Sequence, residues 1–208
     1  MAYVLGFFAA DGYITINKRG GHFFSIDIKD KELIWKIKEA IQSEHAISVR
    51  KRAGGQYTSY RLQIGSIEMC ADLQRLGFNA RKTNNLRVPK VPSEYFNHFV
   101  RGYFDGDGNV WCGYVHKERR TKLLALRVIF TSCSREFLYM FRRKLEKVDV
   151  VNGVISQSKG NYYRLTYSIH NALKLSEFMY NGLSASKLFL KRKKDVFLGY
   201  KVAAVAHR

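Results

Sequence analysis

The chain has 208 residues, 46% of them hydrophobic, which is enough for a packed core in one domain or two small ones and excludes an intrinsically disordered chain. Its 36 lysines and arginines stand against 17 acidic residues, so the formal charge is +19 and a polyanionic partner is indicated. The basic residues are spread along the chain, which predicts a folded basic surface rather than a charged tail.

The three cysteines, Cys70, Cys112 and Cys133, form no CxxC pair. Their odd number and spacing argue against a disulfide framework and a zinc site, and indicate a reducing compartment. No apolar run approaches the roughly 20 residues that a membrane span needs, and no basic region precedes the first apolar run. We therefore expect a soluble protein without a membrane partner, located in the cytoplasm (with the nucleoid) or in an organelle matrix, and not secreted.

A short apolar phrase occurs at residues 4–12 (VLGFFAADG) and returns at residues 100–108 (VRGYFDGDG). Each copy has a small residue at its third and seventh positions. Four residues apart on a helix, these positions share one face, where missing side chains let two helix backbones approach closely. The small residues expected at this helix interface are Gly6, Ala10, Gly102 and Gly106.

Both phrases end in Asp-Gly, so two crossing helices would bring Asp11 and Asp107 together at their C-terminal ends. Partial negative charge and unpaired carbonyls at helix ends favour a bound cation there. Hard oxygen ligands suit Mg²⁺, and a metal at such a site can activate water for phosphodiester hydrolysis. The alternative for a single copy is a tight turn after a helix. An EF-hand loop starting at Asp105 is excluded, because Val110 and His116 occupy the glycine and glutamate positions.

Further elements recur in the same order in both halves. Amphipathic spacing predicts helices over residues 31–41 and 67–76, and again over 135–145 and 169–178. Alternating stretches between them predict two pairs of strands in each half, so each half has the order helix, two strands, helix, two strands, helix, in the α+β class. Residues 88–94 contain the only prolines, Pro89 and Pro92, and form the expected linker between a repeat at 1–87 and a repeat at 95–208.

The predicted strands are apolar on one parity and polar on the other, as when Ile14 and Ile16 alternate with Tyr13 and Thr15. Such sheets bury one face under helices and expose the other. A solvated face is the alternative for any one strand, but several polar strands in a strongly basic protein favour contact with DNA. Trp35 is expected in the core. The expected DNA-binding residues are Thr15, Asn17, Arg19, Lys29, Arg50, Arg52, Arg61, Gln63, Trp111, Arg127, Gln157, Arg164 and Thr166.

With the two phrases, their spacing and the linker, the whole chain resembles the single-chain, two-motif form of the LAGLIDADG homing endonucleases. The first phrase departs from the family pattern, because Ala9 stands where Asp105 retains the usual internal acid. The resemblance implies two pseudo-symmetric αββαββα repeats whose antiparallel sheets form a saddle over the major groove. It also implies a monomer that cuts both strands of a long, asymmetric double-stranded DNA site and leaves short 3′ overhangs.

The resemblance also implies the site residues. Asp11 and Asp107, with the main-chain carbonyls of Ala10 and Gly106, would bind Mg²⁺ or Mn²⁺, with Ca²⁺ as a non-catalytic substitute. A basic catalytic residue is expected near each acid: Lys191 in the second half and Lys82 in the first. The spacing of Lys193 matches that of Lys82 more directly, so the choice of lysine stays open, and a solvated basic run is an alternative for both.

A further supporting position is implied at the end of the second strand of each half. It falls on Lys29 or Asp30 in the first half and on Cys133 or Ser134 in the second.

Two other functions remain open for this sequence. One is an RNA maturase that binds its host intron RNA, and the other is a DNA-binding protein that does not cleave. Both catalytic-position acids are retained, which favours cleavage of DNA.

Overall fold

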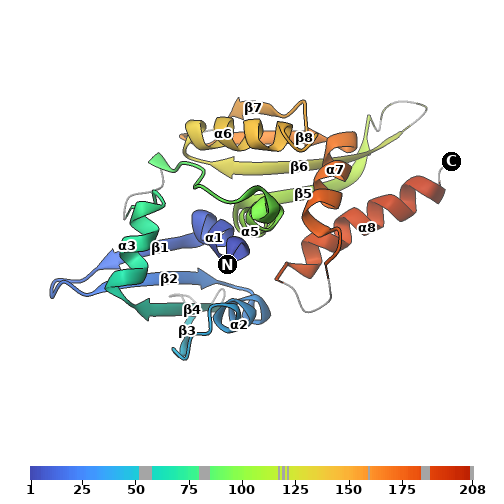
Figure 1. Cartoon of the computed structure of the whole chain (residues 1–208). Coiled ribbons are helices and arrows are strands. Elements are labelled where there is room, and N and C mark those ends of the chain that lie inside the picture. The colour runs from blue at the N-terminus through green and yellow to red at the C-terminus, as the bar shows by residue number, and fades with distance from the viewer. Residues whose placement is uncertain are drawn as a thin grey trace. The chain divides into compact units, whose positions relative to one another are not determined.

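The computed structural model describes residues 1–51, 58–79, 85–116, 118, 120, 122–158, 160–183 and 188–206 (Figure 1). The chain divides into two compact units, residues 1–106 and residues 107–208. Each unit contains a four-stranded sheet with helices packed against it.

The first unit begins with a helix that carries the first phrase and closes with the helix that carries the second. Its elements are α1 (Ala2–Asp11), β1 (Gly12–Ile16), β2 (His22–Ile28), α2 (Lys31–Ala40), β3 (Ile47–Lys51), β4 (Thr58–Gly65), α3 (Ile67–Arg75), the 3₁₀ turn η1 (Ser93–Tyr95) and α5 (Phe96–Asp107). The last residue of α5, Asp107, is the first residue of the second unit.

The second unit repeats the order of two strands, a helix, two strands and a helix that follows α1 in the first unit, and then ends with α8. Its elements are β5 (Gly108–Val115), β6 (Leu123–Ser132), α6 (Arg135–Glu146), β7 (Val154–Gln157), β8 (Tyr163–Ser168), α7 (Ile169–Tyr180) and α8 (Lys191–Ala206).

The two sheets have the same topology. The strand order is β1-β2-β4-β3 in the first and β5-β6-β8-β7 in the second, and every pairing is antiparallel. In the first unit α2 and α3 pack on the sheet, and in the second α6 and α7 do so (Figure 1). The α+β class and the repeated αββαββα order expected from the sequence are therefore confirmed.

Polar side chains cap the first turns of two sheet-covering helices, α2 and α6. The side chain of Asp30 accepts a hydrogen bond from the amide of Leu33 at 2.8 Å and so caps α2. Ser134 does the same for Phe137 at the start of α6, at 3.2 Å. Each side chain satisfies a backbone donor that has no partner within the helix, which fixes the first turn.

The buried face of each helix meets the apolar parity of the strands. Leu33, Ile34 and Ile37 of α2 are almost inaccessible to solvent, as are Ile26 and Leu62 of the sheet. The second unit is built in the same way, with an aromatic contact between Phe130 of β6 and Phe141 of α6 (ring centroids 5.0 Å apart). Each sheet is therefore covered on one face by apolar side chains of its helices.

Three apolar residues depart from the expected pattern. Trp35 is 50% exposed, so its expected place in the core is wrong: the buried stripe of α2 runs through residues 33, 34 and 37, and Trp35 points away from it. Ile16 and Val49 are 51% and 60% exposed, although they share the apolar parity. Both lie on outer strands of the first sheet, Ile16 at the end of β1 and Val49 in β3.

Inside the first unit α1 and α5 cross with their backbones in contact. A Cβ atom added at Gly6 would lie 2.1 Å from the carbonyl oxygen of Phe99, and one added at Gly102 would lie 2.0 Å from that of Tyr3. Neither helix has room for a methyl group at the crossing. The compact units follow this packing rather than the repeat, since α5 is grouped with α1.

A buried hydrogen bond ties the same two helices together. The Tyr3 hydroxyl donates to Oδ2 of Asp105 at 2.7 Å, and both residues are only 3% exposed. Arg101, 2% exposed, lies with its guanidinium carbon 5.4 Å from the centre of the Tyr3 ring. A polar pair in a close-packed interface favours one register of the two helices, because a shifted register would leave its members unpaired.

The crossing predicts a specific loss of stability. We expect Gly6→Ala and Gly102→Ala each to lower the free energy of unfolding by more than about 1 kcal/mol, because the added methyl group forces the helices apart. Gly199→Ala in α8 is the matched control: apart from its chain neighbours and the adjacent backbone of its own helix, nothing lies within 4 Å of the added Cβ, and the gain in helix propensity should raise the free energy of unfolding by up to about 1 kcal/mol. Chemical denaturation of the three variants measures this, and equal stabilities would contradict the close packing.

Candidate active site and nucleic-acid interface

Asp11 ends α1 with an exposed carboxylate. The amide of Gly12 turns back to the carbonyl oxygen of Phe8 and closes the helix. The carboxylate lies beside α5, since a Cβ added at Gly106 would be 3.2 Å from Oδ2 of Asp11 and 2.3 Å from Cβ of Ala10. The end of α1 is therefore held against the residue that precedes Asp107.

Asp107 ends α5 and is half-buried, and β5 begins at the next residue. Within the second unit the Asp107 carboxylate influences the ionisation of the Cys133 thiol. Burial raises the pKa of the Cys133 thiol, and the negative charge of Asp107 raises it further. Cys133, one of the two supporting positions expected in this half, is therefore an uncharged neighbour of the acid.

The lysines at the start of α8 lie in different environments. Lys193 is 7% exposed, and its Nζ donates to the carbonyl oxygen of Gly108 at 2.6 Å, one residue after Asp107. The side chain of Lys191 is 85% exposed and pairs with Asp195 one turn along the helix, at 3.4 Å. Lys82, the expected counterpart in the first half, lies outside the described residues. Of Lys191 and Lys193, it is Lys193 that lies beside the end of α5.

The remaining supporting positions have structural partners. Asp30 and Ser134 cap α2 and α6, as described above. Lys29, next to Asp30, is exposed.

The open face of the first sheet carries a connected set of polar side chains. The hydroxyl oxygen of Ser25, which is fully buried, accepts from Nη2 of Arg61 and from Nε2 of Gln63, each at 3.3 Å. The Arg61 guanidinium also lies 5.7 Å from the centre of the Tyr13 ring. On the outer side, Nη1 of Arg50 pairs with Oδ2 of Asp27 at 3.3 Å. These contacts restrict the arginine rotamers before any ligand binds.

Other expected contact residues of the first unit have mixed roles. Thr15 and Arg19 are exposed. The side-chain oxygen of Asn17 accepts from the amides of Arg19 and Gly21, at 2.9 and 2.8 Å, and so shapes the turn between β1 and β2. Arg52 lies outside the described residues.

The second sheet has a matching open face. Arg127 is paired with Trp111 in the strand register, its guanidinium lies 5.9 Å from the Trp111 ring, and the tryptophan is 42% exposed. Arg164 and Thr166 of β8 lie on the same parity, opposite Thr131 and Ile129 of β6.

The strand register separates Gln157 from this row. Gln157 is paired with Tyr163, on the parity that faces the helices, whereas Ser156 is paired with Arg164 and shares the open face. Three further polar residues lie on the open faces beside the expected residues but were not predicted from the sequence: Ser25 and Asp27 in the first sheet and Ser156 in the second. Ser25 and Asp27 alternate with Ile26 and Ile28 in the sequence, a signal that could have found them, whereas the face of Ser156 depends on the register between β7 and β8.

The described residues contain no cluster of three or more His, Cys, Asp or Glu side chains that could hold a metal ion. The site expected from the sequence is of another kind, with one carboxylate at each helix end completed by main-chain carbonyls, water and substrate phosphate. None of the helices in the described ranges is both long and apolar enough to cross a membrane.

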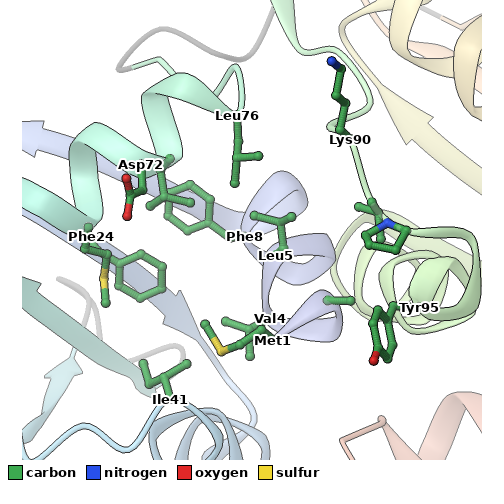
Figure 2. A pocket seen from close by; sticks show the side chains of 15 residues that line it. Met1, Val4, Leu5, Phe8, Phe24, Ile41, Asp72, Leu76, Lys90 and Tyr95 are labelled. Carbon is green, nitrogen blue, oxygen red and sulfur yellow. The ribbon is translucent and has the colours of Figure 1, made fainter.

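An apolar hollow of about 670 Å³ lies elsewhere in the first unit. Figure 2 shows its lining, which includes Val4, Leu5 and Phe8 from α1, Leu76 beyond α3, and Tyr95. Such a lining offers few donors to a phosphate, so this hollow is not a candidate for phosphodiester chemistry.

Comparison with known proteins identifies the fold and the family. The family model of the LAGLIDADG-like domain matches residues 1–77 and 94–179. The chain is similar to part of a reverse gyrase of Methanocaldococcus jannaschii, with 27% identity over 136 residues, which is 65% of this chain and 8% of that protein's length. It is also similar to an uncharacterized protein of the same organism, with 22% identity over 211 residues, covering 94% of this chain and 69% of that protein.

Solved structures with the same fold come from meganucleases. The LAGLIDADG meganuclease I-AabMI bound to uncleaved DNA has a TM-score of 0.63 at 14% identity, covering 99% of this chain and 90% of that chain. I-SmaMI bound to uncleaveable DNA has a TM-score of 0.64 at 13% identity, covering 98% and 88%. The homing endonuclease I-DmoI has a TM-score of 0.61 at 16% identity, covering 92% and 95%.

The family model matches both halves of the chain, the two units share one strand order, and each motif helix ends at an aspartate. The chain therefore belongs to the LAGLIDADG family, in its single-chain, two-motif form.

Proposed function

We propose that this protein is a homing endonuclease that hydrolyses both strands of a long, asymmetric DNA target with a divalent metal and leaves short 3′ overhangs. The observation that carries the proposal is the retention of a terminal aspartate in both motifs, Asp11 at the end of α1 and Asp107 at the end of α5. Solved relatives of this fold are named as meganucleases bound to DNA. Each aspartate would serve the cleavage of one strand.

The open faces of the two sheets are the proposed DNA-binding surface of the monomer. A formal charge of +19 favours association with a phosphate backbone and predicts strong salt dependence. Side chains on these faces supply hydrogen-bond donors and a stacking surface at positions suited to base edges. They are Arg61 and Gln63 in the first sheet, and Trp111, Arg127 and Arg164 in the second. The restricted rotamers of Arg61 favour reading of a base over diffuse contact with phosphate.

The oxygen ligands at the ends of α1 and α5 suit a magnesium ion. Carboxylates, the main-chain carbonyls of Ala10 and Gly106, water and phosphate form a hard oxygen set, and Mg²⁺ keeps several waters in such sites. When bound, the metal would lower the pKa of a water and stabilise the leaving oxygen of the phosphodiester. We propose Mg²⁺ or Mn²⁺ as the active ion and Ca²⁺ as a non-catalytic substitute. The relative I-SmaMI was bound to an uncleaved DNA target in the presence of calcium ions.

The helix crossing supports this site physically. Gly6 and Gly102 allow the backbones of α1 and α5 to touch, so the Asp11 carboxylate lies against Gly106. Carboxylates and carbonyls gathered at helix C-termini repel one another and attract a cation. The side chains of Asp11 and Asp107 would hold the metal.

Lys193 is the better supported of the two described lysine candidates in the second half. Its ammonium group is buried, is bonded to the carbonyl of Gly108, and thus lies beside the strand that begins after Asp107. A positive charge there would steady the charge that develops on the attacked phosphate. Lys191, exposed and paired with Asp195, is better placed for a phosphate contact outside the site.

Selection of cleaved sites from a randomised DNA library in Mg²⁺ tests the proposed function directly. A nuclease of this kind should yield one long, asymmetric site, with a cut in each strand and short 3′ ends. A long site that is bound but stays intact in Mg²⁺ and Mn²⁺ would instead show a silent DNA-binding protein. Binding of structured host intron RNA without any DNA site would show a maturase.

Neutralising one aspartate should separate binding from cleavage. We expect Asp11→Asn and Asp107→Asn each to slow cleavage of the selected site by at least about 100-fold. DNA binding without metal should be unchanged or tighter, because one carboxylate no longer repels phosphate. Cleavage assays and fluorescence anisotropy measure the two quantities. Asp72→Asn, which alters an exposed acid paired with Arg75 on α3, is the control and should cut normally.

Substitution of Lys193 and of Lys191 should affect DNA cleavage differently. We expect Lys193→Met to slow single-turnover cleavage by at least about tenfold with little change in DNA affinity, as loss of a charge near the reacting phosphate would. Lys191→Met should change cleavage by less than about twofold at saturating protein, since it removes a solvated charge. The reverse order would assign the role to Lys191.

Arginines on the open faces of the sheets should contribute more to DNA affinity than arginines on the helices. We expect Arg61→Ala and Arg164→Ala each to weaken binding of the selected site by about 1–3 kcal/mol if they read bases. The effect on unrelated DNA should be smaller. Arg75→Ala, on the exposed side of α3, is the control. Equal losses on selected and unrelated DNA would mark Arg61 and Arg164 as phosphate contacts.

A further inference from the structure

A single acidic residue lies among the strands. Within the eight described strands, Asp27 of β2 is the one aspartate or glutamate, although the same strands carry several arginines. It occupies the parity of Ser25, so its side chain is on the open face of the first sheet. A carboxylate on a surface built for a polyanion raises the cost of binding any phosphate nearby.

Asp27 is held next to Arg50. Its Oδ2 atom lies 3.3 Å from Nη1 of Arg50, which reaches across from β3, and the side chains are 24% and 52% exposed. Arg61 lies between them in the strand order, opposite Asp27 in the register, but is already bound to Ser25 and stacked on Tyr13. Asp27 is therefore not needed to position Arg61, and its visible partner is Arg50.

An exposed ion pair of this kind contributes little to folding. It does, however, present a hydrogen-bond donor and an acceptor side by side. In the major groove, a guanine–cytosine pair offers the acceptors O6 and N7 on guanine and a donor, the N4 amino group, on cytosine. An arginine matches the guanine edge with two hydrogen bonds, and an adjacent carboxylate matches the cytosine amino group.

We propose that Asp27 and Arg50 together read one guanine–cytosine pair of the target, with Arg50 donating to O6 and N7 of guanine and Asp27 accepting from N4 of cytosine. The inference rests on the proposed function, in which the open face of the first sheet contacts the major groove. Asp27 also acts against wrong sequences. Where no amino group faces it, its charge stays unpaired or binds Arg50 away from the DNA, and both outcomes weaken binding.

The test is a selection of bound, uncleaved sequences from a randomised library in Ca²⁺, run in parallel with the wild-type protein and Asp27→Asn. The wild-type profile should contain a guanine–cytosine position whose preference falls by about tenfold in the variant. That position should shift toward adenine–thymine, because an asparagine amide matches both N6 and N7 of adenine. Arg50→Lys should weaken the same position, since lysine cannot reproduce the two-pronged contact.

Asp149→Asn is the matched control. Asp149 is also an acid held in a surface ion pair, with Lys174, but it lies outside the strands, so the same change should leave the profile unaltered. Thermal unfolding of each variant confirms that it is folded. An unchanged profile for Asp27→Asn, an equal gain of affinity on all sequences, or a change at a position that Arg50→Lys does not affect would overturn the inference. Failure of the wild-type protein to select any site would instead refute the proposed function.

Discussion

The contact between the backbones of α1 and α5 is the constraint on which the rest of the structure depends. Gly6 and Gly102 lack the Cβ atoms that would keep the helices apart, and the Tyr3–Asp105 hydrogen bond fixes their register. Because α1 ends at Asp11, the same contact decides where that carboxylate lies. The Asp11 side chain is held against Gly106, and α5 ends at the next residue. One short stretch of sequence therefore sets both the helix packing and the position of an acid, which explains why its small residues and its acid occur together.

The sheets add a second level of order to a strongly basic protein. A charge of +19 attracts any nucleic acid, but charge alone does not distinguish sequences. In the first sheet the arginines are restrained by neighbours: Arg61 by Ser25 and Tyr13, and Arg50 by Asp27. Side chains whose rotamers are restricted before binding lose less entropy when they meet a base edge, so these contacts favour recognition of particular bases. In the proposed complex, the acid on this face would strengthen the same effect by weakening attachment to DNA that offers it no donor.

The helices and the succession of helices and strands along the chain could be predicted because their signals are local. Residues 33, 34 and 37 share a helical face, Asp30 and Ser134 lie where capping residues are needed, and the second half repeats the pattern. The failures are equally physical. Trp35 is exposed because it falls outside the buried stripe of α2, a point that hydrophobicity alone does not reveal. Val49 has the correct parity but lies on an outer strand, where burial is not determined by alternation.

The sequence by itself determined the duplication, the αββαββα order and the aspartate at the end of each motif helix, since these follow from periodicity and repeated residues. Only the tertiary structure decided which side chains become partners. It separates buried Lys193, bonded to the carbonyl of Gly108, from exposed Lys191, although the two are neighbours in one basic run. It also brings Arg50 to Asp27 across the sheet. Such pairs depend on strand register and on the reach of side chains from elements far apart in the chain, and a local pattern contains neither.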